Sequence, residues 1–160
     1  MSPGEPNARE IERYLHEHIP LSRAMGVSVR EVTNERVLLG APLAPNINHR
    51  ETVFGGSAAA LAMLACWTLL RVRLQAATID ARVVVRRGEL DFQEPLAGEF
   101  EALCELEEPA SWQAFERILR RRGRARIGLS AMLMHAARPC VSFRGEFAAI
   151  RNPAGPRDRA

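Results

Sequence analysis

A short polar segment directly before the longest apolar run holds the side chains best suited to chemistry. Asn48, His49 and Glu51 precede the pair Gly55–Gly56, and no further charge appears until Arg71. His49 and Glu51 can take up a proton, while Asn48 can orient a water molecule or hold a carbonyl group. The segment therefore has the residue types for base-assisted attack of water on a carbonyl carbon.

Gly55 and Gly56 open a predicted helix, and that position has its own chemistry. The first N–H groups of a helix have no partner within it, and the macrodipole makes this end positive. A carbonyl oxygen placed there gains negative charge as water attacks, and fixed donors stabilise that charge. Glycine also lets a substrate come close. The pair equally fits a tight turn or close helix–sheet packing, so both interpretations stay open.

Two other features could contact a substrate. Ser57 lacks the G-x-S-x-G pattern of serine hydrolases, so a hydrogen bond in the first helical turn is its expected role. A basic cluster follows later in the chain, formed by Arg120, Arg121, Arg122, Arg124 and Arg126. Since the arginine fork binds phosphate well, the cluster predicts either a phosphate contact or a solvated helix end. No aromatic residues interleave with it, which disfavours nucleic acid as a partner.

The composition indicates one domain in a reducing compartment. The chain has 160 residues, 47% hydrophobic and 26% charged, with a net charge of +3, and this length suits a single core. Three widely spaced cysteines predict neither a zinc motif nor a disulfide framework, and the N-terminus has no signal pattern. We expect a cytoplasmic protein without metal or bound cofactor, with one domain over residues 1–151 and a polar tail over 152–160.

The apolar run after the glycines is either a membrane span or a buried helix. Phe54 to Leu70 lacks charge and is close to the minimum length for crossing a bilayer. It is rich in alanine, however, and Arg71 and Arg73 close it. Because the rest of the chain is amphipathic, we expect a buried central helix over about 54–74 and no membrane partner.

The flanking segments predict a sheet that surrounds this helix. An amphipathic helix begins at Asn7 and ends at Pro20, and two short strands follow it. Four strands come after the central helix, with a bulge near Gly88 in the first and a helix over 109–122 between the second and third. Gly123 suits the end of that helix. The order predicts an α+β hotdog fold, a curved antiparallel sheet of about six strands wrapped round a long central helix.

Several segments resemble the thioesterase domain found at the C-terminal end of YiiD-type proteins. The resemblance covers roughly residues 11–151 and rests on "YLHEHIPLSRAMGV", "APLAPNINHRETVFGGS", "LDFQEPLAGEFEA" and "RRRGRARIGLSAMLMHAARPCVSFRGEFAAI". The acetyltransferase domain that such proteins can carry is not in this sequence. The resemblance implies a hotdog fold, a homodimer or dimer of dimers, and hydrolysis of acyl thioesters.

The related hotdog thioesterases of PaaI type share a pattern of Asn, then Gly, then His-Gly-Gly at the helix start, with an acid about two turns further on. Asn48 matches the Asn, and Gly55–Gly56 match the glycine pair. Phe54 stands in the His position, Glu51 in the inner Gly position, and Met63 where the acid would be. Because that acid usually supplies the base or nucleophile, either the base comes from elsewhere or the chemistry is slow.

Together, the residues and the resemblance predict hydrolysis of acyl-CoA or acyl-carrier-protein thioesters. Asn48 and the amides of the two glycines would hold the thioester, with Glu51 the favoured base and His49 the second choice. The other expected substrate contacts are Phe54, Ser57, Met63, Arg120, Arg122 and Arg124, the arginines meeting the phosphates of coenzyme A.

Two alternatives remain open from the sequence. A non-catalytic acyl-CoA-binding hotdog protein is the first, and Met63 at the acid position favours it. A hotdog hydratase or dehydratase is the second, and it would need His49 and Glu51 as a catalytic pair. The sequence does not predict the acyl chain or its carrier.

Overall fold

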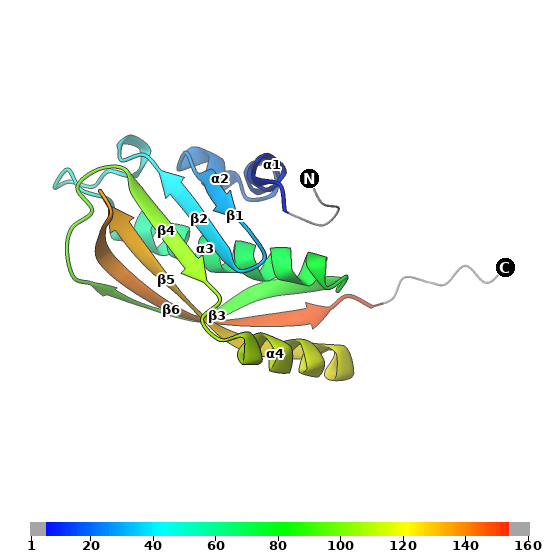
Figure 1. Cartoon of the computed structure of the whole chain (residues 1–160). Coiled ribbons are helices and arrows are strands. Elements are labelled where there is room, and N and C mark those ends of the chain that lie inside the picture. Colours follow the sequence, from blue (N-terminus) through cyan, green and yellow to red (C-terminus); the bar gives the residue numbers. More distant parts are fainter. Residues whose placement is uncertain (1–5, 154–160) are drawn as a thin grey trace.

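A computed structural model of the chain describes residues 6–153 and contains one antiparallel sheet and a long central helix (Figure 1). The helices are α1 (Ala8–His18), α2 (Pro20–Ala24), the 3-10 turn η1 (Ala44–Asn46), α3 (Gly55–Ala76) and α4 (Pro109–Arg122). The strands are β1 (Ser28–Val32), β2 (Arg36–Ala41), β3 (Ala81–Phe92), β4 (Phe100–Glu105), β5 (Arg124–His135) and β6 (Arg138–Arg151). The six-stranded sheet has the order β1-β2-β4-β5-β6-β3.

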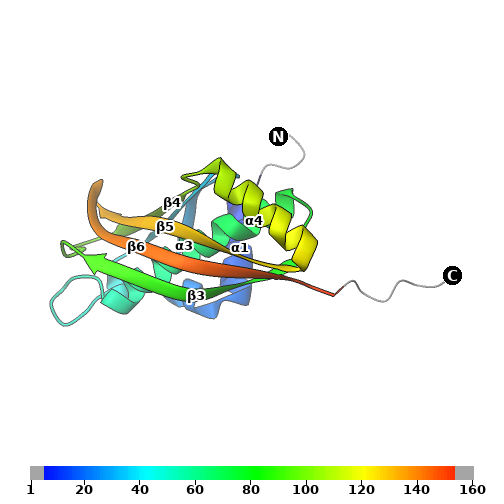
Figure 2. The same ribbon diagram turned by 90° about the horizontal axis from the view of Figure 1, so that it is seen from below.

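The core forms where the sheet closes round α3. Leu61, Ala62, Ala65 and Leu69 of this helix are completely buried, and the small alanines let the strands approach closely. Figure 2, seen from below, shows β5 and β6 passing in front of α3. By length and composition α3 could cross a bilayer, but 56% of its most apolar window is buried inside the protein. The predicted buried central helix and α+β hotdog fold are confirmed.

The N-terminal helix covers one edge of the sheet. Asn7 caps α1, since its side-chain oxygen accepts from the Arg9 amide at 3.0 Å. On the same helix, the Glu12 carboxylate accepts from the Val29 amide of the edge strand β1 at 2.8 Å. The chain then continues into the short helix α2, which the sequence did not predict because Pro20 can begin a helix as well as end one.

The opposite edge of the sheet is β3, a long strand that pairs only with β6. Its register shifts between Val85 and Arg87, which confirms the predicted bulge slightly before Gly88. Val83 packs against the core before the shift, and Leu90 packs against it after the shift. The other side of β3 has no strand beside it within residues 6–153, so its backbone groups there lack a ladder partner.

The helical insert α4 covers the C-terminal end of α3. Trp112, Phe115 and Leu119 are buried, and the Arg73 guanidinium of α3 lies 4.4 Å from the centre of the Trp112 ring. As predicted, Gly123 ends α4 with a φ of 72°, where glycine fits best. Figure 1 shows α4 below the sheet.

The end of β6 is tied to the start of β3. The Asn152 side chain donates to Asp80 Oδ1 at 2.7 Å, and its amide donates to the Asp80 carbonyl at 3.1 Å. The predicted tail, 152–160, lies outside the described residues from 154 onward.

Candidate functional site

The loop that leads into α3 is built round Asn48. Its side-chain oxygen accepts from the amides of Arg50, at 2.8 Å, and Thr52, at 3.2 Å. Its Nδ2 donates to Thr52 Oγ1 at 3.0 Å and to the Val53 carbonyl at 3.3 Å. The turn is so tight that Glu51 takes a φ of 61°, which residues with side chains rarely adopt. Asn48 therefore shapes the loop through both ends of its amide.

The start of α3 leaves two hydrogen-bond donors without partners. No side chain caps this helix. The Phe54 carbonyl accepts from the amides of Ser57, at 2.9 Å, and Ala58, at 3.1 Å. The Gly55 and Gly56 amides have no acceptor among residues 6–153. Two adjacent free N–H groups thus stand at the positive end of the helix macrodipole.

A pocket of about 310 Å³ opens beside these donors. Its lining comprises Asn48, Thr52, Val53, Gly55, Ala58, Phe92, Gln93, Glu94, Pro95, Leu96 and Val141. We call it the mouth pocket. It unites two predicted site residues, Asn48 and Gly55. The two predicted bases, Glu51 and His49, are exposed and do not line it.

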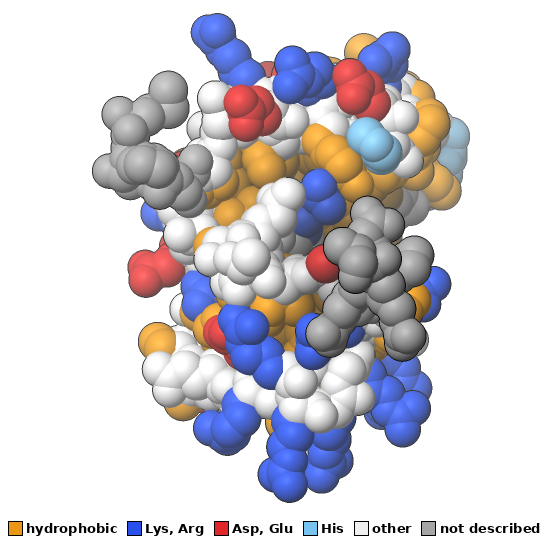
Figure 3. Space-filling model, turned by 90° about the vertical axis from the view of Figure 1, so that its right-hand side faces the viewer, with side chains coloured by type: hydrophobic (Ala, Val, Ile, Leu, Met, Phe, Trp, Pro, Cys, Tyr) orange, Lys and Arg blue, Asp and Glu red, His pale blue; other side chains and the backbone are white. Residues whose placement is uncertain are grey.

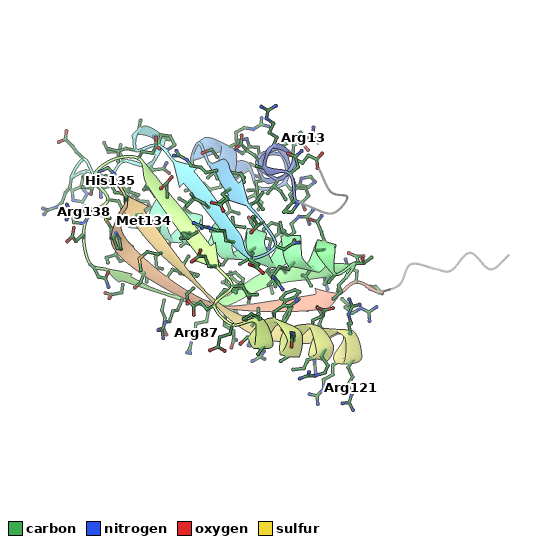
Figure 4. The ribbon with its side chains drawn as sticks, viewed as in Figure 1. Arg13, Arg87, Arg121, Met134, His135 and Arg138 are labelled. Carbon is green, nitrogen blue, oxygen red and sulfur yellow. The ribbon has the colours of Figure 1, made fainter. Side chains whose placement is uncertain are left out.

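Glu94 is the only ionisable residue in the lining of the mouth pocket, and the sequence analysis missed it. It follows β3, in a loop whose Gln93 and Glu94 amides both donate to the Cys140 carbonyl at 3.0 Å. The Glu94 carboxylate accepts from Arg138 at 3.1 Å. Figure 4 labels Arg138 and His135 at this end of the sheet. The carboxylate directly after a strand was the available signal, but nothing local links it to α3.

Three exposed apolar side chains lie in the mouth pocket's lining or directly next to lining residues in the sequence, and Phe92 is the one that lines it. Ile47, Phe54 and Phe92 are 48%, 58% and 55% exposed, respectively. The Phe54 ring lies over Gly56, and the Phe92 ring is 3.5 Å from where a side chain on Gly55 would begin. We call these three residues the apolar rim. Phe54 thus lies where an acyl chain could contact it.

Met63 lies away from the mouth pocket of its own chain. It contributes to a separate apolar hollow of about 190 Å³, with Ile19, Ala60, Leu64, Trp67, Val85 and Phe147. Ser57 stands in the first turn of α3 but does not line the mouth pocket either. Neither residue provides a proton-accepting group in that pocket.

The basic cluster lies at the far end of α3 from the glycines. Arg120 donates to the Ala77 carbonyl at 2.7 Å and to Glu116 at 2.9 Å, so it holds α4 against the C-terminus of α3. Since α3 has 22 residues, this end is about 33 Å from Gly55 at 1.5 Å per residue. Figure 4 labels Arg121 at the end opposite Arg138. A single chain does not bring the cluster to the mouth pocket.

Arg122 and Arg124 share a groove on the outer face of the sheet. The groove has a volume of about 1040 Å³ and is lined by Val84, Arg86, Ile118, Arg122, Gly123, Arg124, Ala125, Arg126, Ala148 and Ile150. Glu146 pairs with Arg86 at 2.9 Å and with Arg126 at 3.9 Å. Arg121, Arg122 and Arg124 form no ion pair within the described chain, and of these three Arg122 and Arg124 line the groove.

The cysteines do not provide a nucleophile. Cys66, Cys104 and Cys140 are free and buried. A hydrogen bond with Cys104, and then burial, raise the pKa of the Cys66 thiol well above its ordinary value, which disfavours the reactive thiolate. In the part of the chain that the structure describes, no three His, Cys, Asp or Glu side chains converge as metal ligands.

The sheet wrapped round α3 defines a hotdog fold, and a pocket opens at the start of that helix. Residues 8–151 match the family described as "Putative thioesterase (yiiD_Cterm)". This match spans nearly the whole sequence, and the protein belongs to that family.

Solved structures share the fold over most of their length. A protein of unknown function from Chlorobaculum tepidum is 29% identical, with a TM-score of 0.89 over 95% of this chain and 100% of that one. A Shewanella oneidensis protein described as a putative thioesterase is 23% identical, with a TM-score of 0.79 over 89% and 96%. A probable thioesterase from Pseudomonas aeruginosa is 21% identical, with a TM-score of 0.79 over 93% and 99%. The last two similarities bear on the fold alone.

Proposed function

We propose that this protein hydrolyses acyl thioesters of coenzyme A or of an acyl-carrier protein. The observation that carries the proposal is that Gly55 and Glu94 line one pocket, and that the amides of Gly55 and of the adjacent Gly56 are unpartnered. Thioester hydrolysis needs donors for the developing oxyanion and an acceptor for the proton of water. Membership of a thioesterase family supports the same reaction.

The proposed reaction uses water and the groups at the mouth pocket. The thioester carbonyl oxygen accepts hydrogen bonds from Gly55 and Gly56. The Glu94 carboxylate takes a proton from water as the water oxygen bonds to the carbonyl carbon. The oxyanion then collapses, the C–S bond breaks, and the leaving sulfur receives that proton. The products are a carboxylic acid and a thiol, and no bound cofactor is required.

The remaining groups position the substrate. Asn48 keeps the loop in the shape that exposes the two glycine amides. The apolar rim, Ile47, Phe54 and Phe92, receives the acyl chain near its thioester end. Burial of apolar surface contributes roughly 25 cal/mol per Å² to such binding.

Glu94 replaces the base proposed from the sequence because it lies in the pocket. The side chains of Glu94, Glu51 and His49 are all exposed, but Glu94 alone of the three lines the mouth pocket. Glu94 also pairs with Arg138. A base must come within hydrogen-bond reach of the proton that it removes, directly or through one water. Glu51 and His49 therefore serve as comparison positions in the test.

The second function that we consider is acyl-CoA binding without catalysis. The observation that favours it is Met63, which stands where related enzymes carry an acid and cannot accept a proton. An apolar rim and free helix amides would bind an acyl thioester without a base. This function and hydrolysis differ in whether free thiol appears.

We propose a homodimer as the smallest functional unit. The free side of β3 offers a long row of unpaired backbone groups, which proteins usually cover or pair. The charges of β3 are also divided, with Arg82, Arg86 and Arg87 before Gly88 and Glu89 and Asp91 after it. In an antiparallel pair of identical strands, each basic half faces an acidic half.

Thiol release from a panel of acyl-CoA and acyl-carrier-protein substrates of different chain length tests the proposed function. We expect turnover with the wild-type chain and its loss in Glu94→Gln. Calorimetry with the same substrates measures binding separately. Binding without thiol release at any chain length would favour the non-catalytic protein, and no binding would contradict both functions.

A further inference from the structure

A second groove, of about 800 Å³, lies at the end of α3 away from the mouth pocket. It is bounded by α1, the C-terminal half of α3 and the first residues of β3. We call it the Arg71 groove; its lining includes Tyr14, Trp67, Arg71, Leu74, Ile79 and Val83. Figure 3 faces this end of the molecule, where hydrophobic side chains lie in a band above an arginine-rich lower part.

Arg71 presents an unused hydrogen-bonding edge in this groove. The centre of its guanidinium lies 3.7 Å from the centroid of the Tyr14 ring and 5.9 Å from that of the Trp67 ring. Stacking on a ring uses the face of the guanidinium and leaves the N–H groups at its edge. Those groups have no ion-pair or hydrogen-bond partner among the described residues. The side chain is nevertheless half-buried.

The aromatic residues round Arg71 are held in place. The Trp67 indole N–H donates to the Val83 carbonyl of β3 at 3.1 Å. The Tyr14 ring stacks on His18 at a centroid distance of 4.0 Å. Both rings are thus fixed by partners other than Arg71, so the guanidinium rests on a frame that exists before any ligand arrives. Such preorganisation lowers the entropy cost of binding.

The rest of the lining combines apolar surface with few charges. Leu74 and Ile79 are buried apolar residues at its base. Arg82 adds a second positive charge. Asp80 is the one acidic residue of the lining, and it already accepts from the Asn152 side chain. The groove therefore has a positive balance, and its volume is within the usual range for a small-molecule site.

We propose that the Arg71 groove binds an amphipathic anion. A carboxylate or phosphate on the ligand accepts two hydrogen bonds from the edge of Arg71, and its apolar body lies along Trp67, Leu74 and Ile79. Arginine is the side chain best matched to such paired contacts. The proposal concerns binding alone and does not depend on hydrolysis at the mouth pocket.

Fluorescence of Trp67 tests this binding, with Trp112→Phe as the background so that one tryptophan reports. The probes are octanoate, octyl phosphate and octanol, which share an eight-carbon body and differ in the head group. We expect saturable changes with the two anions, and binding of octanol weaker by about tenfold or more, because charge-assisted hydrogen bonds are the strong ones. The anion that binds more tightly identifies the head group that the groove prefers.

Arg71→Gln keeps much of the side chain and removes the charge. We expect it to weaken octanoate and octyl phosphate binding by about tenfold or more while octanol binding stays as it was. Arg117→Gln, at an exposed position of α4 outside both grooves, removes the same charge elsewhere and should change nothing. Asn48→Ala should leave the Trp67 response intact, which separates this site from the mouth pocket.

Three outcomes would overturn the proposal. The first is equal binding of octanol and the anions. The second is an equal loss in Arg71→Gln and Arg117→Gln, which would reflect net charge only. The third is absence of anion binding together with a shift of Arg71→Gln toward monomer in light scattering, which would mean that a second copy of the chain fills the groove. Circular dichroism confirms that each variant is folded.

Discussion

Asn48 and Glu94 line the same pocket at the N-terminus of α3, although one precedes that helix and the other follows β3. The Val53 amide joins their two loops by donating to the Leu96 carbonyl at 2.9 Å. Asn48 shapes the loop that exposes the glycine amides, while Glu94 supplies the only ionisable group in the lining. Substitution of Asn48 should therefore change the shape of the loop, and substitution of Glu94 should change the chemistry.

Glu94→Gln should lower turnover by about a hundredfold or more, since a positioned base typically contributes at least that much. Glu107→Gln removes an exposed carboxylate far from the pocket lining and is the matched control. Thiol release at saturating substrate measures the effect. If Glu51→Gln or His49→Ala lost activity and Glu94→Gln retained it, the base would belong to the loop before α3.

Asn48→Ala should lower both the stability of the folded protein and its turnover. Loss of its hydrogen bonds to Arg50, Thr52 and Val53 should reduce the free energy of unfolding by about 1–2 kcal/mol. Misplacement of the glycine amides should lower turnover by at least about tenfold. Asn48→Asp keeps an acceptor for the two backbone amides, so it should retain more stability and more turnover than Asn48→Ala. Urea unfolding and thiol release provide the two measurements.

Gly56→Ala should disturb the apolar rim, because the new methyl group would overlap the Phe54 ring. The ring is exposed and can turn away, so we expect a raised KM with little change in stability. In a Phe54→Ala background the same substitution should have no further effect. A double-mutant cycle on KM measures this coupling. Additive effects would show that the ring and the glycine act independently.

The charge division of β3 predicts how dimerisation can be broken and restored. Glu89→Arg combined with Asp91→Arg makes the strand wholly basic, so identical strands should repel and the mass should fall toward that of a monomer. Adding Arg82→Glu and Arg87→Glu reverses the division and should restore the dimer. Sedimentation at several protein concentrations checks both. An unchanged dimer in the first variant would place the interface elsewhere.

We expect the double substitution Arg122→Ser and Arg124→Ser to raise KM for coenzyme A thioesters more than it lowers turnover. This follows if the phosphates of coenzyme A contact the outer groove. The wild-type KM should also rise with salt, since exposed charges are screened within about 8 Å at physiological ionic strength. Arg120→Ser is the contrasting variant: it loses the bond to Ala77 and should reduce stability instead. Equal KM in all three proteins would leave the cluster without a role in binding.

The fold could be predicted because its signals are local. The uncharged run after Gly56 predicted α3, the change of apolar phase along β3 predicted its bulge, and Gly123 marked the end of α4. Each depends on a few neighbouring residues and on one periodicity. Even α2 was missed only because Pro20 permits two local outcomes.

The site was predicted only in part, because it combines loops that are distant in the sequence and that come together only when the sheet forms. Asn48 and Gly55 are near neighbours in sequence, and the structure places them together. Glu94 joins them only after β3 has paired with β6 and its loop has docked on the Cys140 carbonyl. Conversely, Arg120 looked available for phosphate because nothing in the sequence shows that the C-terminus of α3 would engage it.

The sheet order has a consequence for synthesis on the ribosome. β3 pairs with β6, the last strand, so β4, α4 and β5 must all be made before β3 acquires a neighbour. Throughout that interval both of its edges are open, which is the condition in which strands join other chains. A chain cut anywhere before Arg138 would lack β6, which is the partner of β3 and one of the two partners of β5. Such fragments should aggregate during translation and would be substrates for chaperones.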